Sequence, residues 1–408
     1  MNVNVIRLRS SLSYDDEKLV SENTNYLDCI NDLLINDNIY LDENLESNLS
    51  VVFVETGGVE SLFVNKLPEL KKPIILISNE KNNSLPASLE IKTYCSLNDI
   101  ACILLQGSEE EVSEKLRKIL PVCNTVLQMQ NKKLGLIGGP SDWLIASKMS
   151  KEDVKKVFGM DIIEIPMEEL FEEIDKKEYG FVSDLAQLRK KARNQETLEG
   201  ALYIYGALKR LVKKYDLNGL SIRCFDMLGK YRNTACLALG LLNEERIISA
   251  CEGDIPSLIT MYIIYLLTGK TSFQANPSKV DQEEFDVIFA HCTMPLNMCK
   301  NFSLDTHFES GLGIGIKGEL ALTDVTVCKL MFDKEKKLLP ESLIASGTIK
   351  ENLSLPNFCR TQINVHLNDY NFMYFMKNKF GNHVIITYSN IAEQLFYLVS
   401  LLDKIEIC

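Results

Sequence analysis

Several kinds of residue are scarce in this chain of 408 residues, and each shortage excludes a class of protein. Proline occurs 11 times and glycine 21 times, against 46% hydrophobic residues, so a disordered or fibrous chain is excluded. Positive charge is also short, since 44 lysines and arginines face 56 aspartates and glutamates, a formal net charge of −12. Because affinity for a phosphate backbone depends on clustered cations, we expect no nucleic-acid partner.

Paired cysteines and long apolar runs are missing as well. The 12 cysteines include no CxxC pair, so we expect reduced thiols rather than a disulfide framework. The most apolar window, Ser257–Leu267, is well short of the roughly 20 residues that cross a bilayer. The first residues contain no apolar stretch long enough for a signal peptide. These features predict a cytoplasmic protein with no membrane partner.

Short apolar runs alternate with helical patterns in the first two thirds of the chain. The first three runs are Val51–Glu55, Pro73–Ser78 and Ala101–Gly107. Runs of this kind, separated by helices, are typical of parallel βα units. The pattern restarts at Lys133–Gly139, and the segment Pro140–Ser147 that follows looks like the entry to a helix. A second domain of the same class is therefore predicted.

After about Gly269 the period of the pattern changes from helical to two. Residues 313–332 alternate around Lys317-Gly318, which predicts antiparallel strands. The sequence thus predicts an α/β protein with two Rossmann-like βα domains, followed by a mostly antiparallel, barrel-like β domain at the C-terminal end. We place the three domains at residues 1–131, 132–270 and 271–408.

The most informative stretch runs from a predicted strand through Cys251-Glu252-Gly253-Asp254 into a helix. Pro256 lies near the first turn of that helix, a position that favours proline. In open α/β sheets ligands bind beyond the carboxyl ends of the strands, so Glu252 is a candidate functional carboxylate. For Asp254 we favour the structural role of a helix N-cap.

Only four histidines occur, so each can be considered in turn. His291, His307 and His383 lie at or near the ends of predicted strands, and each alone fits a structural role. Together with Glu252 they could instead converge on one divalent cation. A mixed set of carboxylate and imidazole ligands suits Mn, Fe, Co or Zn. Their spacing leaves both interpretations open, because there is no compact HxxxH motif.

Eight segments of the chain resemble the successive signature blocks of L-fucose isomerase-like proteins. The blocks occur in one order from about residue 51 to 390, so the resemblance covers most of the chain. They are ETGG (55–58), GGPSDWLIAS (138–147), CEGDIPSLITM (251–261), FQANPS (273–278), AHCTMP (290–295), THFESGLGIGIKGEL (306–320), CRTQ (359–362) and GNHVIITY (381–388).

The resemblance implies a fold and a chemistry. The L-fucose and L-arabinose isomerase superfamily has two Rossmann-like domains and a C-terminal β domain. Its members interconvert aldoses and ketoses with a divalent metal, commonly Mn²⁺. By motif, Glu252 is similar to the metal-binding glutamate, His383 to the C-terminal histidine ligand and His291 to a further histidine ligand. The resemblance thus implies an aldose–ketose isomerase, and a catalytically silent sugar-binding or regulatory protein is the alternative.

Asn276 departs from the family pattern, because it stands where a second metal carboxylate is expected. An amide oxygen can bind a metal or a substrate, but it cannot act as a base. Isomerisation moves a proton through an enediol on the open-chain sugar, and three possibilities remain for this chain. Glu252 could work with another acid such as Asp254 or Glu309, or a metal-bound water could make the second transfer. The third possibility is that the protein no longer isomerises.

Other residues in the blocks are candidate sugar contacts. A structural alternative stands beside each: tight turns for the glycines, a core position for the tryptophan and a buried structural role for the arginine. The candidates are Gly57, Gly58, Asp142, Trp143, His307, Glu309, Arg360 and Gln362. Arg360 makes an anionic sugar worth testing, since the superfamily includes members that act on a sulfonated hexose.

The superfamily also implies a homo-oligomer, a trimer or hexamer, in which the sites lie at subunit interfaces. No nicotinamide cofactor is expected, because neither glycine pair, Gly57-Gly58 nor Gly138-Gly139, forms a GxGxxG fingerprint. Cys251, Cys292 and Cys359 lie beside candidate site residues. We interpret them as small packing residues, because nothing near them in sequence plainly lowers their pKa.

Overall fold

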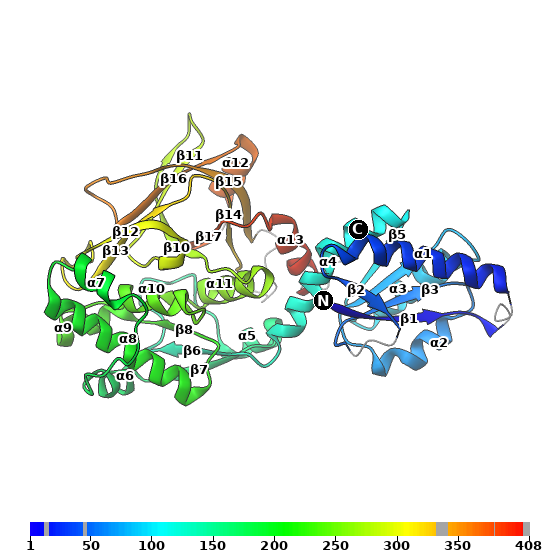
Figure 1. Cartoon of the computed structure of the whole chain (residues 1–408), viewed down its shortest axis with the longest axis horizontal. Helices are drawn as coiled ribbons and strands as arrows, with labels where there is room; N and C mark the ends of the chain where they lie inside the picture. The colour runs from blue at the N-terminus through cyan, green and yellow to red at the C-terminus, as the bar shows by residue number, and fades with distance from the viewer. Residues whose placement is uncertain (12–15, 44–46, 332–341, 379, 403–408) are drawn as a thin grey trace. The chain divides into compact units, whose positions relative to one another are not determined.

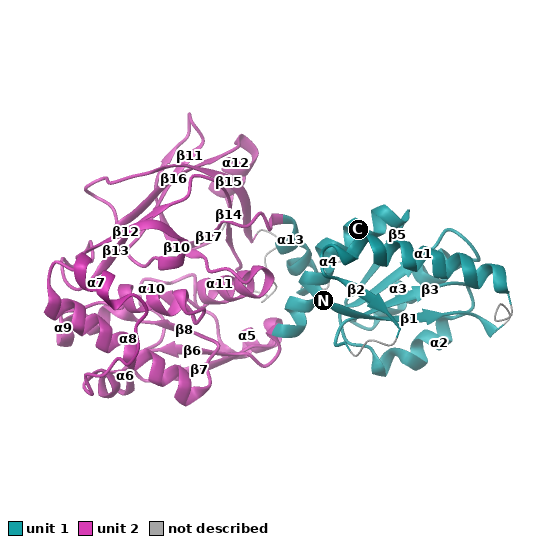
Figure 2. Ribbon diagram, in the orientation of Figure 1, with its two compact units in different colours: residues 1–128, 393–408 teal, residues 129–392 magenta. Residues whose placement is uncertain are grey.

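The computed structural model describes residues 1–11, 16–43, 47–331, 342–378 and 380–402 (Figure 1). The chain divides into two compact units, residues 1–128 with 393–408 and residues 129–392 (Figure 2). The predicted alternating segment 313–332 ends at Phe332 and the predicted C-terminal domain ends at Cys408. Both of these end residues lie outside the described residues. Both parallel sheets and the antiparallel barrel predicted from the sequence are present, so the predicted fold class is confirmed.

The first unit is built on a five-stranded parallel sheet with the order β2-β1-β3-β4-β5. The central strands are buried almost throughout, as expected for strands covered by helices on both faces. Its elements are β1 (Asn2–Leu8), α1 (Glu17–Ile35), β2 (Tyr40–Asp42), β3 (Ser50–Val54), α2 (Glu60–Lys66), β4 (Ile74–Ser78), α3 (Ser84–Leu97), β5 (Cys102–Gln106), α4 (Glu109–Met129) and α13 (Ala392–Leu402).

The second unit begins with a four-stranded parallel sheet of the order β7-β6-β8-β9. Strands β8 and β9 are completely buried and end at the same edge of the sheet. Its elements are β6 (Lys133–Ile137), α5 (Lys151–Phe158), β7 (Asp161–Ile165), α6 (Met167–Ile174), α7 (Leu185–Lys191), α8 (Gln195–Tyr215), β8 (Gly219–Ile222), α9 (Met227–Tyr231), α10 (Cys236–Glu244), β9 (Ile248–Cys251) and α11 (Ile255–Thr268).

The rest of the second unit is a closed antiparallel barrel with the order β10-β11-β16-β15-β14-β17, and β17 pairs with β10 to close it. A two-stranded ribbon, β12 and β13, stands beside it. The elements are β10 (Phe273–Asp281), β11 (Asp286–His291), β12 (Cys299–Asp305), β13 (Gly315–Leu320), β14 (Asp324–Lys329), β15 (Leu343–Asn352), β16 (Thr361–Leu367), α12 (Asp369–Lys377) and β17 (Val384–Thr387).

Helix α11 joins the sheet to the barrel within the second unit. It packs on β8 and β9 and also on β10, β14 and β17 (Figure 1). One hydrophobic core therefore runs from Ile137 and Ile222 in the sheet to Val327 and Ile386 in the barrel. The predicted boundary at residue 270 falls inside this unit. None of the helices in the described ranges combines the length and apolar character that crossing a membrane requires.

The predicted helix entry at Pro140–Ser147 is wrong. This segment contains no helix, and α5 begins only at Lys151 with Ser150 as its N-cap. The backbone N–H of Ser141 donates instead to the carbonyl oxygen of Glu252, at 2.9 Å. The loop is thus held by a distant partner, and its apolar residues do not belong to a helix face.

The pair Lys317-Gly318 is not the turn between two strands. Both residues lie inside β13, which pairs with the preceding strand β12. The chain leaves β13 at Leu320, and β14 begins at Asp324 as part of the barrel. The alternation around this pair did indicate β structure, but the strands bond to other partners.

Helix α8 packs closely against the segment around Glu178 at Gly206, and a substitution there tests this packing. A Cβ placed on Gly206 would overlap the backbone of Glu178 and Tyr179, whereas one on Gly229 in α9 would meet nothing. We expect Gly206→Ala to lower the free energy of unfolding by about 1–3 kcal/mol through overpacking. The matched variant Gly229→Ala should leave it unchanged or raise it by about 0.5–1 kcal/mol. Urea denaturation measures both, and equal stability would contradict the packing of α8.

Candidate metal and sugar site

Glu252 occupies the expected place at the carboxyl edge of the second sheet. It follows β9 directly, and its φ of 64° lies in the left-handed region, which is uncommon for a residue other than glycine. Gly253 follows with φ 67°, and a Cβ there would overlap the backbone of Gly139 and Pro140. The glycine therefore lets the strand turn sharply into α11 and presents Glu252 at the edge. Strain of this kind is concentrated at functional sites.

Glu252 opens into a cavity of about 340 Å³ within the second unit. Its walls come from the β9–α11 junction, the barrel strands β10 and β11, and the loops around them. The residues that line it are Trp143, Phe225, Cys236, Cys251, Glu252, Asn276, His291, Cys292, His307, Glu309, Cys359 and Asn382. Most were singled out from the sequence, although they are far apart along the chain.

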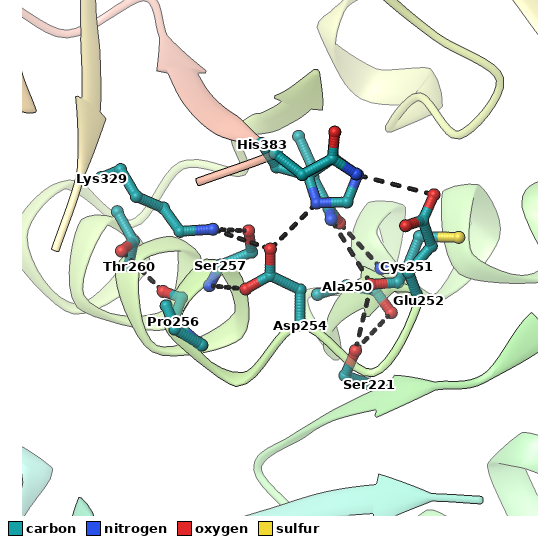
Figure 3. A network of polar contacts seen from close by, with 12 residues as sticks. Ser221, Ala250, Cys251, Glu252, Asp254, Pro256, Ser257, Thr260, Lys329 and His383 are labelled. Atoms are coloured by element: carbon teal, nitrogen blue, oxygen red, sulfur yellow. Dashed lines mark hydrogen bonds and ion pairs between the residues drawn. The ribbon is translucent and has the colours of Figure 1, made fainter. Parts of the chain in front are cut away.

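His383 lies completely buried beside Glu252, immediately before β17 (Figure 3). Its Nδ1 donates to Oδ2 of Asp254 at 2.9 Å, so in the neutral form of the ring the lone pair is on Nε2. Nε2 lies 3.6 Å from Oε1 of Glu252 and has no hydrogen-bond partner among the described residues. A buried nitrogen without a partner is costly unless a ligand satisfies it.

His291, at the end of β11, completes a group of three. One ligand atom each from Glu252, His291 and His383 lies within 4.8 Å of the others. Burial lowers the pKa of His291 to about 3, so the ring is neutral. Its Nδ1 accepts a hydrogen bond from the backbone N–H of Thr293, which places the ring proton on Nε2. Metal binding through Nε2 requires that proton to leave this nitrogen. The tautomer of His291 is therefore less suited to metal binding than that of His383.

Glu252 is held as a carboxylate. Burial raises its pKa, but the neighbouring His383 ring in its protonated form outweighs burial and lowers the pKa to about 2. The indole N–H of Trp143 donates to Oε2 at 2.6 Å, and the Trp143 ring packs edge-on against Phe225. The one tryptophan of the chain therefore touches the candidate metal ligand through its polar edge.

These three side chains fit a divalent metal. They supply one carboxylate and two imidazoles, a donor set that suits Mn, Fe, Co or Zn. His383 has the partner that metal-binding histidines usually have, because its second nitrogen donates to a carboxylate. The partnerless Nε2 of His383 supports the same assignment.

Three more predicted residues also line the cavity. Nδ2 of Asn276 donates to Oδ1 of Asn382 at 3.1 Å, so the amide oxygen is the atom that can act as a neutral acceptor. Nδ1 of His307 lies 3.0 Å from the Ser310 hydroxyl. Burial and the charge of Glu252 raise the pKa of Glu309. With Glu252, His291, His383 and Trp143, the structure thus brings together seven of the predicted site residues.

Other predicted residues do not line this cavity. Both Asp142 oxygens pair with Arg223, at 3.1 and 2.7 Å. The Gln362 amide bonds to the backbone of Leu355 and Cys359. Gly57 and Gly58 lie after β3 in the first unit. Substrate binding by these residues stays a prediction.

Arg360 is fixed near the cavity rather than in its wall. Its Nε donates to the backbone oxygen of Thr306 at 2.6 Å, and one terminal nitrogen donates to the Thr306 hydroxyl at 3.0 Å. The guanidinium lies over the Phe308 ring. Burial lowers the pKa of His307, and the Arg360 charge adds to this effect. Arg360 is therefore the cation whose field reaches His307.

The sequence analysis did not anticipate a cavity rich in thiols. Four of the lining residues are cysteines, and Sγ of Cys251 lies 3.3 Å from that of Cys224. The neighbouring Cys359 thiol lowers the pKa of Cys292. Cys292 and Cys359 are 67 positions apart in the sequence, so no local motif pairs them. Cys236 carried no signal, because it begins the apolar helix α10, and Phe225 belonged to none of the recognised segments.

Trp143 supplies a direct probe of metal binding. We expect Mn²⁺ added to the metal-free protein to quench Trp143 fluorescence, because the indole bonds to Glu252, and EDTA to restore it. His383→Asn should weaken Mn²⁺ binding by more than the roughly 10- to 100-fold cost of losing an outer partner. His366→Asn is the matched control, since His366 bonds to Asp286 away from the cavity. Identical titration curves for wild type and His383→Asn would remove His383 from the ligand set.

Comparison with known proteins supports the resemblance found in the sequence. No family model matches the chain. It is 21% identical to the sulfoquinovose isomerase of Priestia aryabhattai over 379 residues, covering 87% of this chain and 84% of that protein. Proteins of the same name from Alkalicoccus urumqiensis and Clostridium sp. (strain MSTE9) are each 26% identical over 52% and 55% of this chain, and 49% and 52% of their own lengths. The chain is thus a distant relative of proteins named sulfoquinovose isomerase.

Proposed function

We propose that this chain is a metal-dependent aldose–ketose isomerase acting on an open-chain sugar through an enediol. The observation that carries the proposal is the buried Nε2 of His383, which lies 3.6 Å from Oε1 of Glu252 and has no hydrogen-bond partner among the described residues. In the proposal Glu252, His291 and His383 hold the cation, which we take to be Mn²⁺, and the Asn276 amide oxygen is a neutral ligand or substrate contact. The resemblance to the isomerase superfamily also implies that the protein forms a homo-oligomer, either a trimer or a hexamer.

The chemistry divides between the cation and the side chains. A bound divalent cation would polarise the sugar carbonyl as a Lewis acid. Isomerisation also moves a proton between C1 and C2, so a side chain has to take the proton and return it. Glu252 is less suited to that task, because its Oε2 accepts from the Trp143 indole and its Oε1 faces His383. Its geometry beside His383 suits a ligand.

Glu309 is the carboxyl group that we assign to proton transfer. It lines the same cavity, and its raised pKa makes it a stronger base than an ordinary carboxylate. Asp254 is less suitable, because both of its oxygens are engaged. Oδ1 caps the helix at the N–H of Ser257, at 2.8 Å, and Oδ2 accepts from His383. In this proposal Asp254 therefore acts through His383.

A sulfonated hexose is the substrate that we would test first. The named relatives support this choice, and a sulfonate requires a positive or hydrogen-bonding partner. Neither lysine nor arginine occurs among the described residues that line the cavity. Arg360, fixed by Thr306 beside His307, is the nearby cation that we assign to the anionic group.

Proton NMR in heavy water tests this division of roles. With Mn²⁺ and a sulfonated hexose we expect chelator-sensitive deuterium uptake at C2 and formation of the ketose. Glu309→Gln should lower kcat by about 10²- to 10⁴-fold, because proton transfer is lost, with Mn²⁺ affinity retained. Glu252→Gln should lose Mn²⁺ binding as well as turnover.

Glu164→Gln, on the exposed face of β7, is the control and should behave as wild type. Full turnover in Glu309→Gln would remove Glu309 from the mechanism. Binding of sugars without any exchange, across neutral, sulfonated and phosphorylated hexoses, would instead favour the catalytically silent alternative.

Asn276→Asp tests whether the asparagine has its own role. The substitution removes the amide donor and sets a carboxylate against Oδ1 and the backbone oxygen of Asn382, now 3.1 and 3.4 Å from Nδ2. We expect kcat/KM for the sugar to fall by about two- to tenfold, since a typical intramolecular hydrogen bond contributes about 0.5–1.5 kcal/mol. An increase in kcat/KM would indicate that the family carboxylate still fits, and steady-state kinetics decides between the two.

A further inference from the structure

Lys329 is a completely buried lysine that neither the sequence analysis nor the proposed mechanism uses. It ends β14 and points its ammonium group at the start of α11 (Figure 3). In the neighbouring antiparallel strand β17, Ile385 pairs with Cys328. Lys329 therefore lies beside the start of β17, which His383 immediately precedes. A charged side chain at this depth requires compensation.

Two polar groups compensate the ammonium of Lys329. Its Nζ donates to Oδ2 of Asp254 at 2.8 Å and also to the hydroxyl of Ser257. The same Oδ2 accepts from Nδ1 of His383, at 2.9 Å. One carboxylate oxygen therefore binds a lysine and a histidine together, while Oδ1 caps the helix at Ser257.

A buried ion pair of this kind is not explained by stability alone. Removing two charges from water costs so much that a well-packed apolar pair is often as stable or more stable. Residues packed beside Lys329 on β14, such as Val327 and Cys328, are buried and uncharged. The lysine is therefore better explained by what it does to Asp254.

Lys329 restricts the orientation of the Asp254 carboxylate. With Oδ1 bonded to the helix and Oδ2 bonded to Lys329, the carboxylate plane is fixed, and the direction of the acceptor for His383 is fixed with it. Partners of this outer kind set the tautomer and the ring orientation of metal-binding histidines. Figure 3 shows the result: a chain of polar contacts runs from Lys329 through Asp254 and His383 to Glu252.

We propose that Lys329 is a positioning residue that acts through Asp254 to aim Nε2 of His383 at the metal. This inference rests on the proposed function, because it requires a metal on Glu252 and His383. It adds a residue from β14 to a site otherwise built from the turn between β9 and α11, the end of β11 and the residue before β17. Metal affinity then depends on the strand register that places Lys329 beside Asp254, as well as on the metal ligands themselves.

The test compares Lys329→Met, which removes the donor, with Lys329→Gln, which keeps an N–H donor but removes the charge. We expect Lys329→Met to raise the Mn²⁺ dissociation constant by about 10- to 100-fold, the usual cost of an outer partner, and Lys329→Gln to raise it less. Electron paramagnetic resonance of free Mn²⁺ measures the dissociation constant. The ¹⁴N coupling of the bound imidazole should change in Lys329→Met.

Lys317→Met is the matched control, because Lys317 lies on β13 and bonds to Ser354 outside the network. It should bind Mn²⁺ as the wild type does. Thermal unfolding of each variant separates folding from positioning, and Lys329→Gln decides the question if Lys329→Met does not fold. A dissociation constant within twofold of wild type, with unchanged ¹⁴N coupling, would overturn the role of Lys329 even if the variant melts earlier. Failure of the wild type to bind Mn²⁺ would overturn the proposed function itself.

Discussion

The hydrogen bond between Asp254 and His383 is the contact on which the site depends. Asp254 begins α11, the helix packed on the second sheet, and His383 precedes β17, a strand of the barrel. Their contact joins the two layers of the second unit at one buried point. Because Asp254 also caps its own helix, the position of the helix start and the orientation of the histidine ring are set together.

Backbone shape contributes as much as side-chain chemistry. The strand β9 ends in two successive residues with positive φ, Glu252 and Gly253, and the glycine fits against the backbone of Gly139 and Pro140. The same loop carries Trp143, whose indole donates to Glu252. One strained turn therefore places the carboxylate, and a second loop holds it there. A cavity built in this way can keep the geometry of its ligands before any ligand binds.

The electrostatics of the cavity favour a cation over an anion. Glu252 and Glu309 supply the carboxyl groups, the histidines that face them are neutral or bonded to acids, and Asn276 adds no charge. A cation would balance these carboxyl groups, and a sugar would then meet a mixture of amide, imidazole and thiol surfaces. Arg360 is held outside this wall by Thr306, and in the proposed function it binds an anionic substituent without cancelling the acidic centre.

Local pattern was sufficient for part of this protein. The alternation of apolar runs with helices predicted the parallel sheets, the change of period predicted the barrel, and the motif residues Glu252, His291 and His383 meet as expected. Strand β1 was missed because only three of its seven residues are buried, and the loop after Gly139 was mistaken for a helix because its partner is distant. The tertiary structure alone decided that Lys329 and His383, 75 and 129 positions from Asp254, bond to one oxygen. The physical reason is that strand register and helix packing bring these residues together, and neither is written in the spacing of neighbouring residues.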